Sequence, residues 1–150
     1  MYDRLLAVEY AKRWAFDYNP AYYNFSKIGG DCTNFVSQCI FAGGVPMNYS
    51  IYGWYYRSLG DRAPAWTGVN EFWNFATSGN NKGVKIKPCT LEQLEVGDVI
   101  QLYNGLRFYH TLLVTSVADV IRVSAHDNNS FNVPLAVYGF TALRCGKVSD

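Results

Sequence analysis

The sequence predicts an α+β domain in which helices come first and an antiparallel sheet second. Up to about residue 77, apolar residues recur at helical spacing, and Gly and Pro separate the helical stretches. From Asp98 onward, short apolar runs alternate with turn residues, and Asn104-Gly105 between two such runs is a strong hairpin signal. Helices followed by strands in this way are typical of an α+β fold. The length suits one domain, which we expect to cover residues 1–150.

Three helices are expected before the sheet. The first covers about 4–18, with large apolar residues four apart on one face, and ends where Asn19-Pro20 disfavours helical backbone. The second runs from Cys32 to Ala42 between two glycine pairs, which supply a turn before it and a stop after it. The third covers about 69–77. A long irregular segment, 45–68, separates the second and third helices, and segments of this kind are often functional.

The sheet is expected to follow one short helical turn, because Thr90 and Gln93 match a capping box. Asn104-Gly105 joins the first two strands. The expected strands are 99–103, 107–117, 120–125 and one within 138–144.

Composition excludes several classes of function. The net charge is +1 and 17% of residues are charged, so no footprint for nucleic acid or an anionic membrane is expected. No apolar stretch is long enough to span a membrane. No signal peptide is visible, which fits either a cytoplasmic protein or a domain from a longer secreted or wall-associated one. The four cysteines lack metal-site spacing, so we expect free thiols, no metal and no organic cofactor.

Cys32 is the first candidate for chemistry because it begins the second expected helix. Backbone N–H groups at a helix start lack partners, and the positive end of the helix dipole favours a thiolate. Asp31 precedes it and is a candidate N-cap. The alternative is that Cys32 is a small core residue or half of a disulfide, which are common uses of cysteine. The other three cysteines show no motif and fit packing roles, so a reactive Cys32 requires a nearby base.

The chain offers only two histidines as that base, His110 and His126. Both lie on expected strands, and a hairpin turning near Ala118-Asp119 would bring them close across the sheet. One would then act as base and the other as its orienting partner. The alternatives are a hydrogen-bonded histidine on a half-buried strand for His110 and a strand-end residue bonded to the following loop for His126.

Several segments together resemble the putative amidase domain family, which is common in Gram-positive bacteria and related to the NlpC/P60 and CHAP peptidases. The most specific match is the string Asp31-Cys32-Thr33-Asn34-Phe35-Val36-Ser37-Gln38. The other matching segments are 19–25, 42–44, 54–56, Trp66, 96–101, His110 with its apolar strand, and 124–126. The likeness covers essentially the whole chain. It implies a papain-like (NlpC/P60-like) fold in which the N-terminal helices pack on a C-terminal antiparallel sheet that supplies a histidine.

The resemblance also implies roles for particular residues. Cys32 matches the family's nucleophile and His110 its base, while His126 is the nearest match to the third polar residue. Residues expected to support the site or the oxyanion are Tyr22, Tyr23, Asp31 and Asp127. Residues expected to wall a substrate groove are Trp54, Tyr55 and Trp66.

The sequence therefore predicts a cysteine amidohydrolase or peptidase that cleaves amide bonds as a monomer, with cell-wall (peptidoglycan) peptides as the implied substrate. Cys32 would attack the carbonyl, His110 would carry the proton to the leaving amine, and His126 would fix the imidazole tautomer. The Cys32 backbone N–H would help to stabilise the oxyanion. Three alternatives stay open: an acyltransferase using the same thiol, a non-catalytic wall- or peptide-binding module, and a structural domain with Cys32 in a disulfide.

Overall fold

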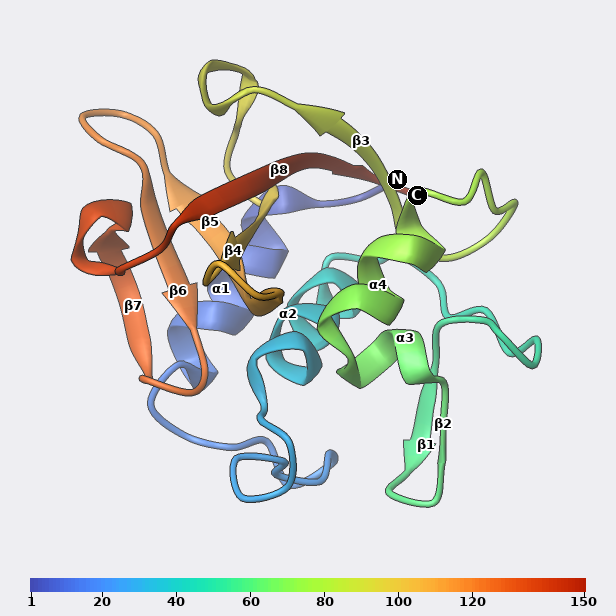
Figure 1. The fold of residues 1–150 in the computed structure, drawn as a ribbon. Helices are drawn as coiled ribbons and strands as arrows, with labels where there is room; N and C mark the ends of the chain where they lie inside the picture. The colour runs from blue at the N-terminus through green and yellow to red at the C-terminus, as the bar shows by residue number, and fades with distance from the viewer.

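The computed structural model describes residues 1–150, and its main helices precede the main sheet (Figure 1). The helices are α1 (Arg4–Trp14), α2 (Cys32–Ala42), α3 (Pro64–Thr67) and α4 (Val69–Ala76), with 3-10 turns η1 (Leu91–Gln93) and η2 (Leu135–Val137). The strands are β1 (Tyr56–Ser58), β2 (Asp61–Arg62), β3 (Lys85–Cys89), β4 (Val99–Tyr103), β5 (Phe108–Ser116), β6 (Arg122–Ala125), β7 (Ser130–Pro134) and β8 (Ala142–Ser149). None of the helices combines the length and apolarity needed to cross a membrane.

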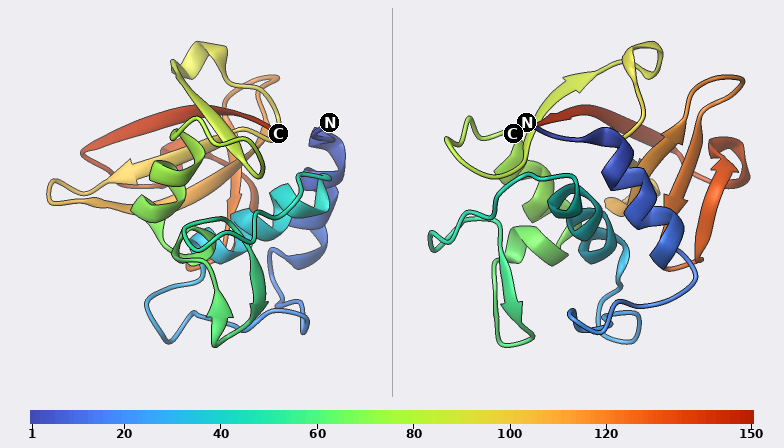
Figure 2. Two further views of the ribbon diagram at one scale, coloured as in Figure 1. Left: turned by 90° about the vertical axis from the view of Figure 1, so that its right-hand side faces the viewer. Right: turned by 180° about the vertical axis from the view of Figure 1, so that it is seen from behind.

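The main sheet has six antiparallel strands in the order β3-β8-β4-β5-β6-β7. The β4–β5 hairpin is confirmed, and Asn104 Oδ1 closes its turn by accepting the N–H groups of Leu106 and Arg107. Figures 1 and 2 show the helices gathered on one side of the curved sheet, with α1 and α2 next to each other. The predicted α+β class is therefore confirmed.

Alternation along the strands divides the core into two layers. Val99 and Leu113 face the helices and join a buried cluster that includes Phe35 of α2. Their neighbours Ile100 and Leu112 face the other side of the sheet and form a second buried cluster. Successive strand residues point to opposite faces, so consecutive apolar residues such as Val99-Ile100 and Leu112-Leu113 require cover on both sides. This is why the sheet carries helices on one face and the η1 and η2 turns near the other.

α1 ends four residues earlier than predicted, and hydrogen bonds explain the difference. The Tyr18 N–H binds the Asp17 carboxylate rather than continuing the helix. The Trp14 carbonyl, which would accept that N–H, instead receives His126 Nε2 at 2.7 Å. A contact with the distant His126, in the turn after β6, therefore helps to terminate α1 before the Asn19-Pro20 signal is reached.

Several elements lie outside the expectations. The segment expected to be irregular, 45–68, contains the β1–β2 hairpin and α3, and β3 and β7 were not predicted. The last strand begins at Ala142, inside the predicted 138–144 range, but continues past it to Ser149. Asp127 and Asn128 both have positive φ, 60° and 77°, which matches the two central positions of a tight hairpin turn between β6 and β7. Asp and Asn tolerate this backbone region well, so the Asp-Asn pair was the available signal for β7.

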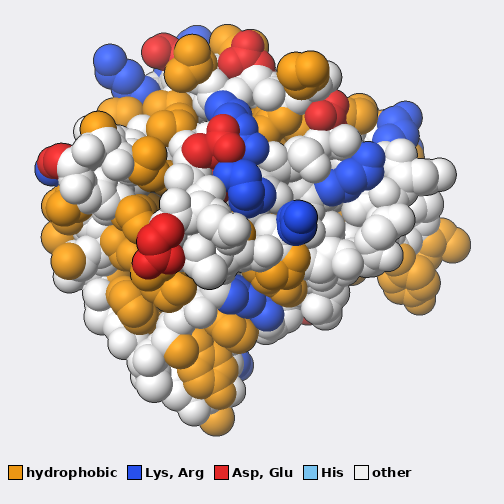
Figure 3. Space-filling model, turned by 90° about the horizontal axis from the view of Figure 1, so that it is seen from above, with side chains coloured by type: hydrophobic (Ala, Val, Ile, Leu, Met, Phe, Trp, Pro, Cys, Tyr) orange, Lys and Arg blue, Asp and Glu red, His pale blue; other side chains and the backbone are white.

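The face seen from above in Figure 3 carries basic and acidic side chains side by side. Within the structure, Lys147 Nζ contacts Glu95 at 2.8 Å and the buried Asp98 at 3.0 Å, and Arg4 contacts the same two carboxylates. Charges of opposite sign thus neutralise each other locally. This view shows no single-sign surface of the kind that nucleic acids bind.

Candidate active site

Cys32 is the first residue of α2, as predicted, and its side chain is only 5% exposed. Its Sγ lies 3.8 Å from the Thr33 hydroxyl, and a backbone hydrogen bond from Thr111 favours the thiolate. Burial has the larger effect and, helped by the charge of Asp127, raises the pKa of the Cys32 thiol. The resting site therefore holds a protonated thiol, and the helix start alone does not produce the thiolate that its position suggested. All four cysteines are free, so the disulfide alternative for Cys32 does not hold.

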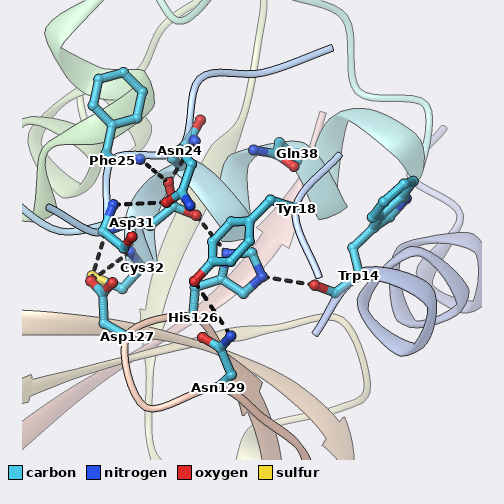
Figure 4. Close-up of polar contacts among 12 residues, drawn as sticks. Trp14, Tyr18, Asn24, Phe25, Asp31, Cys32, Gln38, His126, Asp127 and Asn129 are labelled. Carbon is cyan, nitrogen blue, oxygen red and sulfur yellow. Dashed lines mark hydrogen bonds and ion pairs between the residues drawn. The ribbon is translucent and has the colours of Figure 1, made fainter. Parts of the chain in front are cut away.

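The start of α2 is capped from another part of the chain. Asp127 Oδ2 accepts the N–H groups of Asp31 at 2.7 Å and Cys32 at 3.1 Å (Figure 4). Asp31 occupies the N-cap position as predicted, but its side chain makes no cap hydrogen bond. Gly30 leaves room for this carboxylate, since a Cβ there would lie 2.7 Å from Asp127 Oδ2. The Cys32 N–H, predicted to serve the oxyanion, is thus already occupied by a carboxylate oxygen.

The Asp31 side chain binds the preceding loop and a histidine instead of capping α2. Its Oδ1 accepts the Phe25 N–H at 2.8 Å and the Asn34 side-chain amide at 3.0 Å. Its Oδ2 lies 2.5 Å from Nδ1 of His126. Asp31 and His126 are both about 1% exposed, so this contact is buried.

His126 has no ring nitrogen left for catalysis. Nε2 contacts the Trp14 carbonyl at 2.7 Å, while Nδ1 faces the Asp31 carboxylate. A carbonyl only accepts, so Nε2 must carry a hydrogen, and a proton must also lie between Nδ1 and Oδ2 because a carboxylate is an acceptor too. Phe35 stacks on the ring at 4.1 Å. His126 therefore joins α1, the start of α2 and the end of β6, and the prediction that it orients His110 does not fit these contacts.

His110 lies on β5, where it is 6% exposed between the rings of Tyr109 and Tyr138, at 5.8 and 5.6 Å. Burial lowers the pKa of His110 to about 4, so its imidazole is neutral near pH 7. The β5–β6 register, continued from Leu113↔Ser124, places His110 opposite Asp127 rather than opposite His126. This register difference is the reason that the expected histidine pair does not form.

Thr111 connects Cys32 to the strand that carries His110. Its hydroxyl lies 2.8 Å from that of Thr33, and its backbone hydrogen-bonds toward the Cys32 sulfur. Gln101 of β4 donates to the same Thr111 hydroxyl at 3.1 Å, which fixes it. His110 is the residue immediately before Thr111, although no direct hydrogen bond joins its ring to Cys32. Successive strand residues point to opposite faces, so Thr111 faces α2 while the His110 side chain lies on the other face of the sheet, with Leu102, Leu112 and Tyr138. The structure therefore brings Thr111, and not the His110 ring, to Cys32.

The aromatic residues expected to wall a groove lie in two different environments. Trp54 and Trp66 are fully buried, 4.7 Å apart, and their indole N–H groups bind Ser37 and Asn34. They are core residues that support α2, so that prediction was wrong. Tyr55 is partly buried, and its hydroxyl contacts Asp61 at 3.2 Å.

A hollow of about 450 Å³ instead lies beside the loop that precedes Cys32, where Tyr22, Tyr23 and Tyr56 line it. Tyr22 packs against the Tyr56 ring at 5.1 Å, and the Tyr23 N–H binds the Tyr56 hydroxyl at 2.7 Å. Neither Tyr22 nor Tyr23 forms a hydrogen bond with Cys32, so an oxyanion role for them has no geometric support here. The Tyr23 carbonyl accepts from Asn34, so the hollow adjoins the first turn of α2, although Cys32 itself does not line it.

Comparison with known proteins identifies the family of this chain. A family model described as "Putative amidase domain" matches residues 1–145. The chain belongs to this family. Two similar proteins of Bacillus subtilis (strain 168) are uncharacterized protein YhbB, 36% identical over 128 residues, and uncharacterized protein YjcM, 31% identical over 143 residues. The matches cover 77% and 89% of this chain but 37% and 32% of the relatives, so the chain spans about a third of their length. No solved structure matches the chain.

The Asp127 carboxylate gives this amidase-family domain a testable electrostatic property. Because its charge opposes the Cys32 thiolate, Asp127→Asn is expected to lower the pKa of Cys32 and speed its alkylation, by up to about tenfold for each pKa unit. Asparagine retains an oxygen that can cap α2. The measurement is the iodoacetamide reaction rate at Cys32, followed by peptide mass spectrometry at pH 7. Asp119→Asn removes the same charge at an exposed ion pair and should leave the rate unchanged; equal rates in both variants would contradict this account.

Proposed function

We propose that this domain is a cysteine amidohydrolase in which Cys32 is the nucleophile and His110 is the general base. The observation that carries the proposal is the place of Cys32 at the start of α2, where the Thr111 backbone binds its sulfur. The His110 side chain lies on the other face of β5, so the proposal requires its ring to turn toward Cys32 when substrate binds. A nucleophile at a helix start, packed on a strand that supplies a histidine, is the arrangement of papain-like enzymes, and we extend the proposal to that fold relationship. Membership of the amidase-domain family supports the same reaction class.

The chemistry uses a thiol and an imidazole that are both neutral at rest. His110 takes the Cys32 proton as sulfur attacks the amide carbonyl, and a tetrahedral intermediate forms. The imidazolium then delivers this proton to the leaving amine, and the C–N bond breaks to leave a thioester on Cys32. Water, deprotonated by His110, attacks the thioester and releases the acid, which restores the thiol.

Asp127 occupies the backbone donor that the oxyanion would need. The intermediate carries negative charge on oxygen, and the nearest backbone donor, the Cys32 N–H, already binds Asp127 Oδ2 at 3.1 Å. We propose that the oxyanion replaces this carboxylate contact as it forms, with Asp127 retaining the Asp31 N–H at 2.7 Å.

The proposed substrate is the peptide part of the bacterial cell wall. The tyrosine-lined hollow beside residues 20–24 is open and mixes aromatic faces with hydroxyl groups and Arg57. Such a surface suits an extended peptide with polar side chains. The test is release of new amino groups from purified peptidoglycan peptides by the wild-type domain, with Cys32→Ala as the inactive variant. Equal release by both proteins would refute the assignment.

A non-catalytic binding module is the second candidate. Two observations favour it: the pKa of Cys32 is raised, and no hydrogen bond joins its thiol to His110. This alternative predicts wall binding without amino-group release, and Cys32 alkylation no faster than that of an ordinary buried thiol. An acyltransferase would instead give amide products when amines are added to the reaction.

The low pKa of His110 predicts the acid limit of the activity. Burial disfavours the imidazolium and lowers the pKa from 6.5 to about 4, so the base stays neutral and competent at any pH above about 4. We expect kcat/KM to be insensitive to acid down to about pH 5 and to fall below about pH 4. A pH–rate profile on a peptide substrate tests this, and an acid limb near 6.5 would show that His110 is not buried in the working enzyme.

A further inference from the structure

Cys89 and Cys145 face each other across two paired strands. Cys89 ends β3 and Cys145 lies within β8, and the two residues are direct partners in the antiparallel register. Directly opposite residues project to the same face of a sheet, with Cα atoms about 4.5 to 5.5 Å apart. Disulfides accept Cα separations of about 4.4 to 6.8 Å. The backbone therefore already holds the two thiols where a bond can form.

The two cysteines differ in access, which gives each a separate role. Cys145 is 4% exposed and belongs to the buried cluster that includes Ile100, while Cys89 packs at the rim of that cluster and is partly exposed. β3 is an edge strand: it pairs with β8 on one side and with no strand on the other. A solution oxidant can therefore reach Cys89 first, and Cys145 lies behind it as the resolving thiol.

Cys32 and Cys39 cannot take part in this pairing. They lie seven residues apart on α2, which separates them by about 10 Å along the helix axis and is too far for a disulfide. They also pack on the helical side of the sheet, whereas Cys145 faces the opposite side. The fold therefore places Cys89 and Cys145 opposite each other and leaves Cys32 and Cys39 without a cysteine partner.

We propose that Cys89 and Cys145 form a disulfide when the domain meets a small-molecule disulfide oxidant, while Cys32 remains a free thiol. The Cys89 thiolate attacks one sulfur of the oxidant and releases one thiol. Cys145, after losing its proton, attacks the Cys89 sulfur of this mixed disulfide and releases the second thiol. Two protein thiols are oxidised and one disulfide is reduced to two thiols, so electrons and protons balance. The new bond links β3 to β8 without removing the candidate nucleophile.

Peptide mapping tests this pairing directly. The full chain is incubated with oxidised glutathione, remaining thiols are alkylated in denaturant, and a non-reducing digest is examined by mass spectrometry. We expect one cross-linked species joining the Cys89 and Cys145 peptides, with the Cys39 peptide alkylated and Cys32 free of any link to another cysteine. Glutathione that accumulates on Cys89 without a cross-link, or a cross-link that uses Cys32 or Cys39, would overturn the proposal.

Thermal unfolding gives a second measurement. The bond closes a long loop, from β3 to β8, and a bond of this kind is expected to raise the unfolding temperature by about 10 °C. The rise should disappear on reduction with dithiothreitol. Cys89→Ser, at a partly exposed position, should fold normally and show no rise after the same oxidation; a rise of equal size in this variant would exclude the pair as its cause.

Discussion

Replacement of Cys32 by alanine is expected to reduce amide hydrolysis by at least about a thousandfold while the domain stays folded. The variant removes the only atom that can form the thioester, so the remaining groups cannot replace it. Stability should change little, because the Cys32 side chain is small and lies at the edge of the core, where its contacts are the hydroxyl of Thr33 and the backbone of Thr111. Initial rates on purified peptidoglycan peptides, with circular dichroism to confirm folding, measure the effect.

Cys89→Ser is the matched control for this experiment. It removes another thiol from the same protein, at a partly exposed position on the far strand β3. We expect its rate to equal that of the wild type. A Cys32→Ala rate within a few fold of the wild type would remove Cys32 from the reaction.

Replacement of His126 by alanine is expected to lower the free energy of unfolding by about 3 to 5 kcal/mol. The variant leaves the buried Asp31 carboxylate without its partner at 2.5 Å and the Trp14 carbonyl without its donor at 2.7 Å. Removing the partner of a buried carboxylate costs this much because the carboxylate stays desolvated. For a chain of this length, the loss corresponds to a fall of roughly 10 °C in the unfolding temperature. Urea unfolding followed by circular dichroism measures it.

His110→Ala and a double variant separate stability from chemistry. His110 contacts rings but holds no buried charge, so its replacement should abolish hydrolysis with a much smaller loss of stability. Asp31→Asn combined with His126→Ala should cost clearly less than the sum of the two single changes, because the residues form one unit. Additive losses, or equal destabilisation by the two histidine variants, would show that the Asp31–His126 contact does not anchor the fold.

The parts of the fold that local signals determine were predictable. α2 begins and ends where its flanking glycine pairs indicate, and the capping box at Thr90 and Gln93 forms η1. The β4–β5 hairpin follows from its Asn-Gly turn. In each case, residues within a few positions of one another supply the stabilising contacts, so the sequence carries the full signal.

The organisation of the candidate site was less predictable because its decisive contacts are long-range. The carboxylate that caps α2 comes from Asp127, 95 residues beyond Cys32. Residues close to Cys32 in the sequence gave no signal for it and pointed to Asp31 as the cap. His126 was expected to pair with His110, but the β5–β6 register places Asp127, one residue later, opposite His110. His126 contacts Asp31 instead. The aromatic content of segment 45–68 was visible, yet composition could not show that Trp54 and Trp66 point into the core while Tyr56 lines a hollow.

The covalent state of Cys32 during turnover tests the central claim most directly. The domain is mixed with purified peptidoglycan peptides, quenched in acid within the first turnovers, and digested for mass spectrometry. The account predicts an acyl group on the peptide that contains Cys32, in thioester linkage, which hydroxylamine removes and which Cys32→Ala lacks. Substrate cleavage with no acyl group on Cys32, under conditions in which a control cysteine peptidase shows its own thioester, would contradict the assignment of Cys32 as the nucleophile.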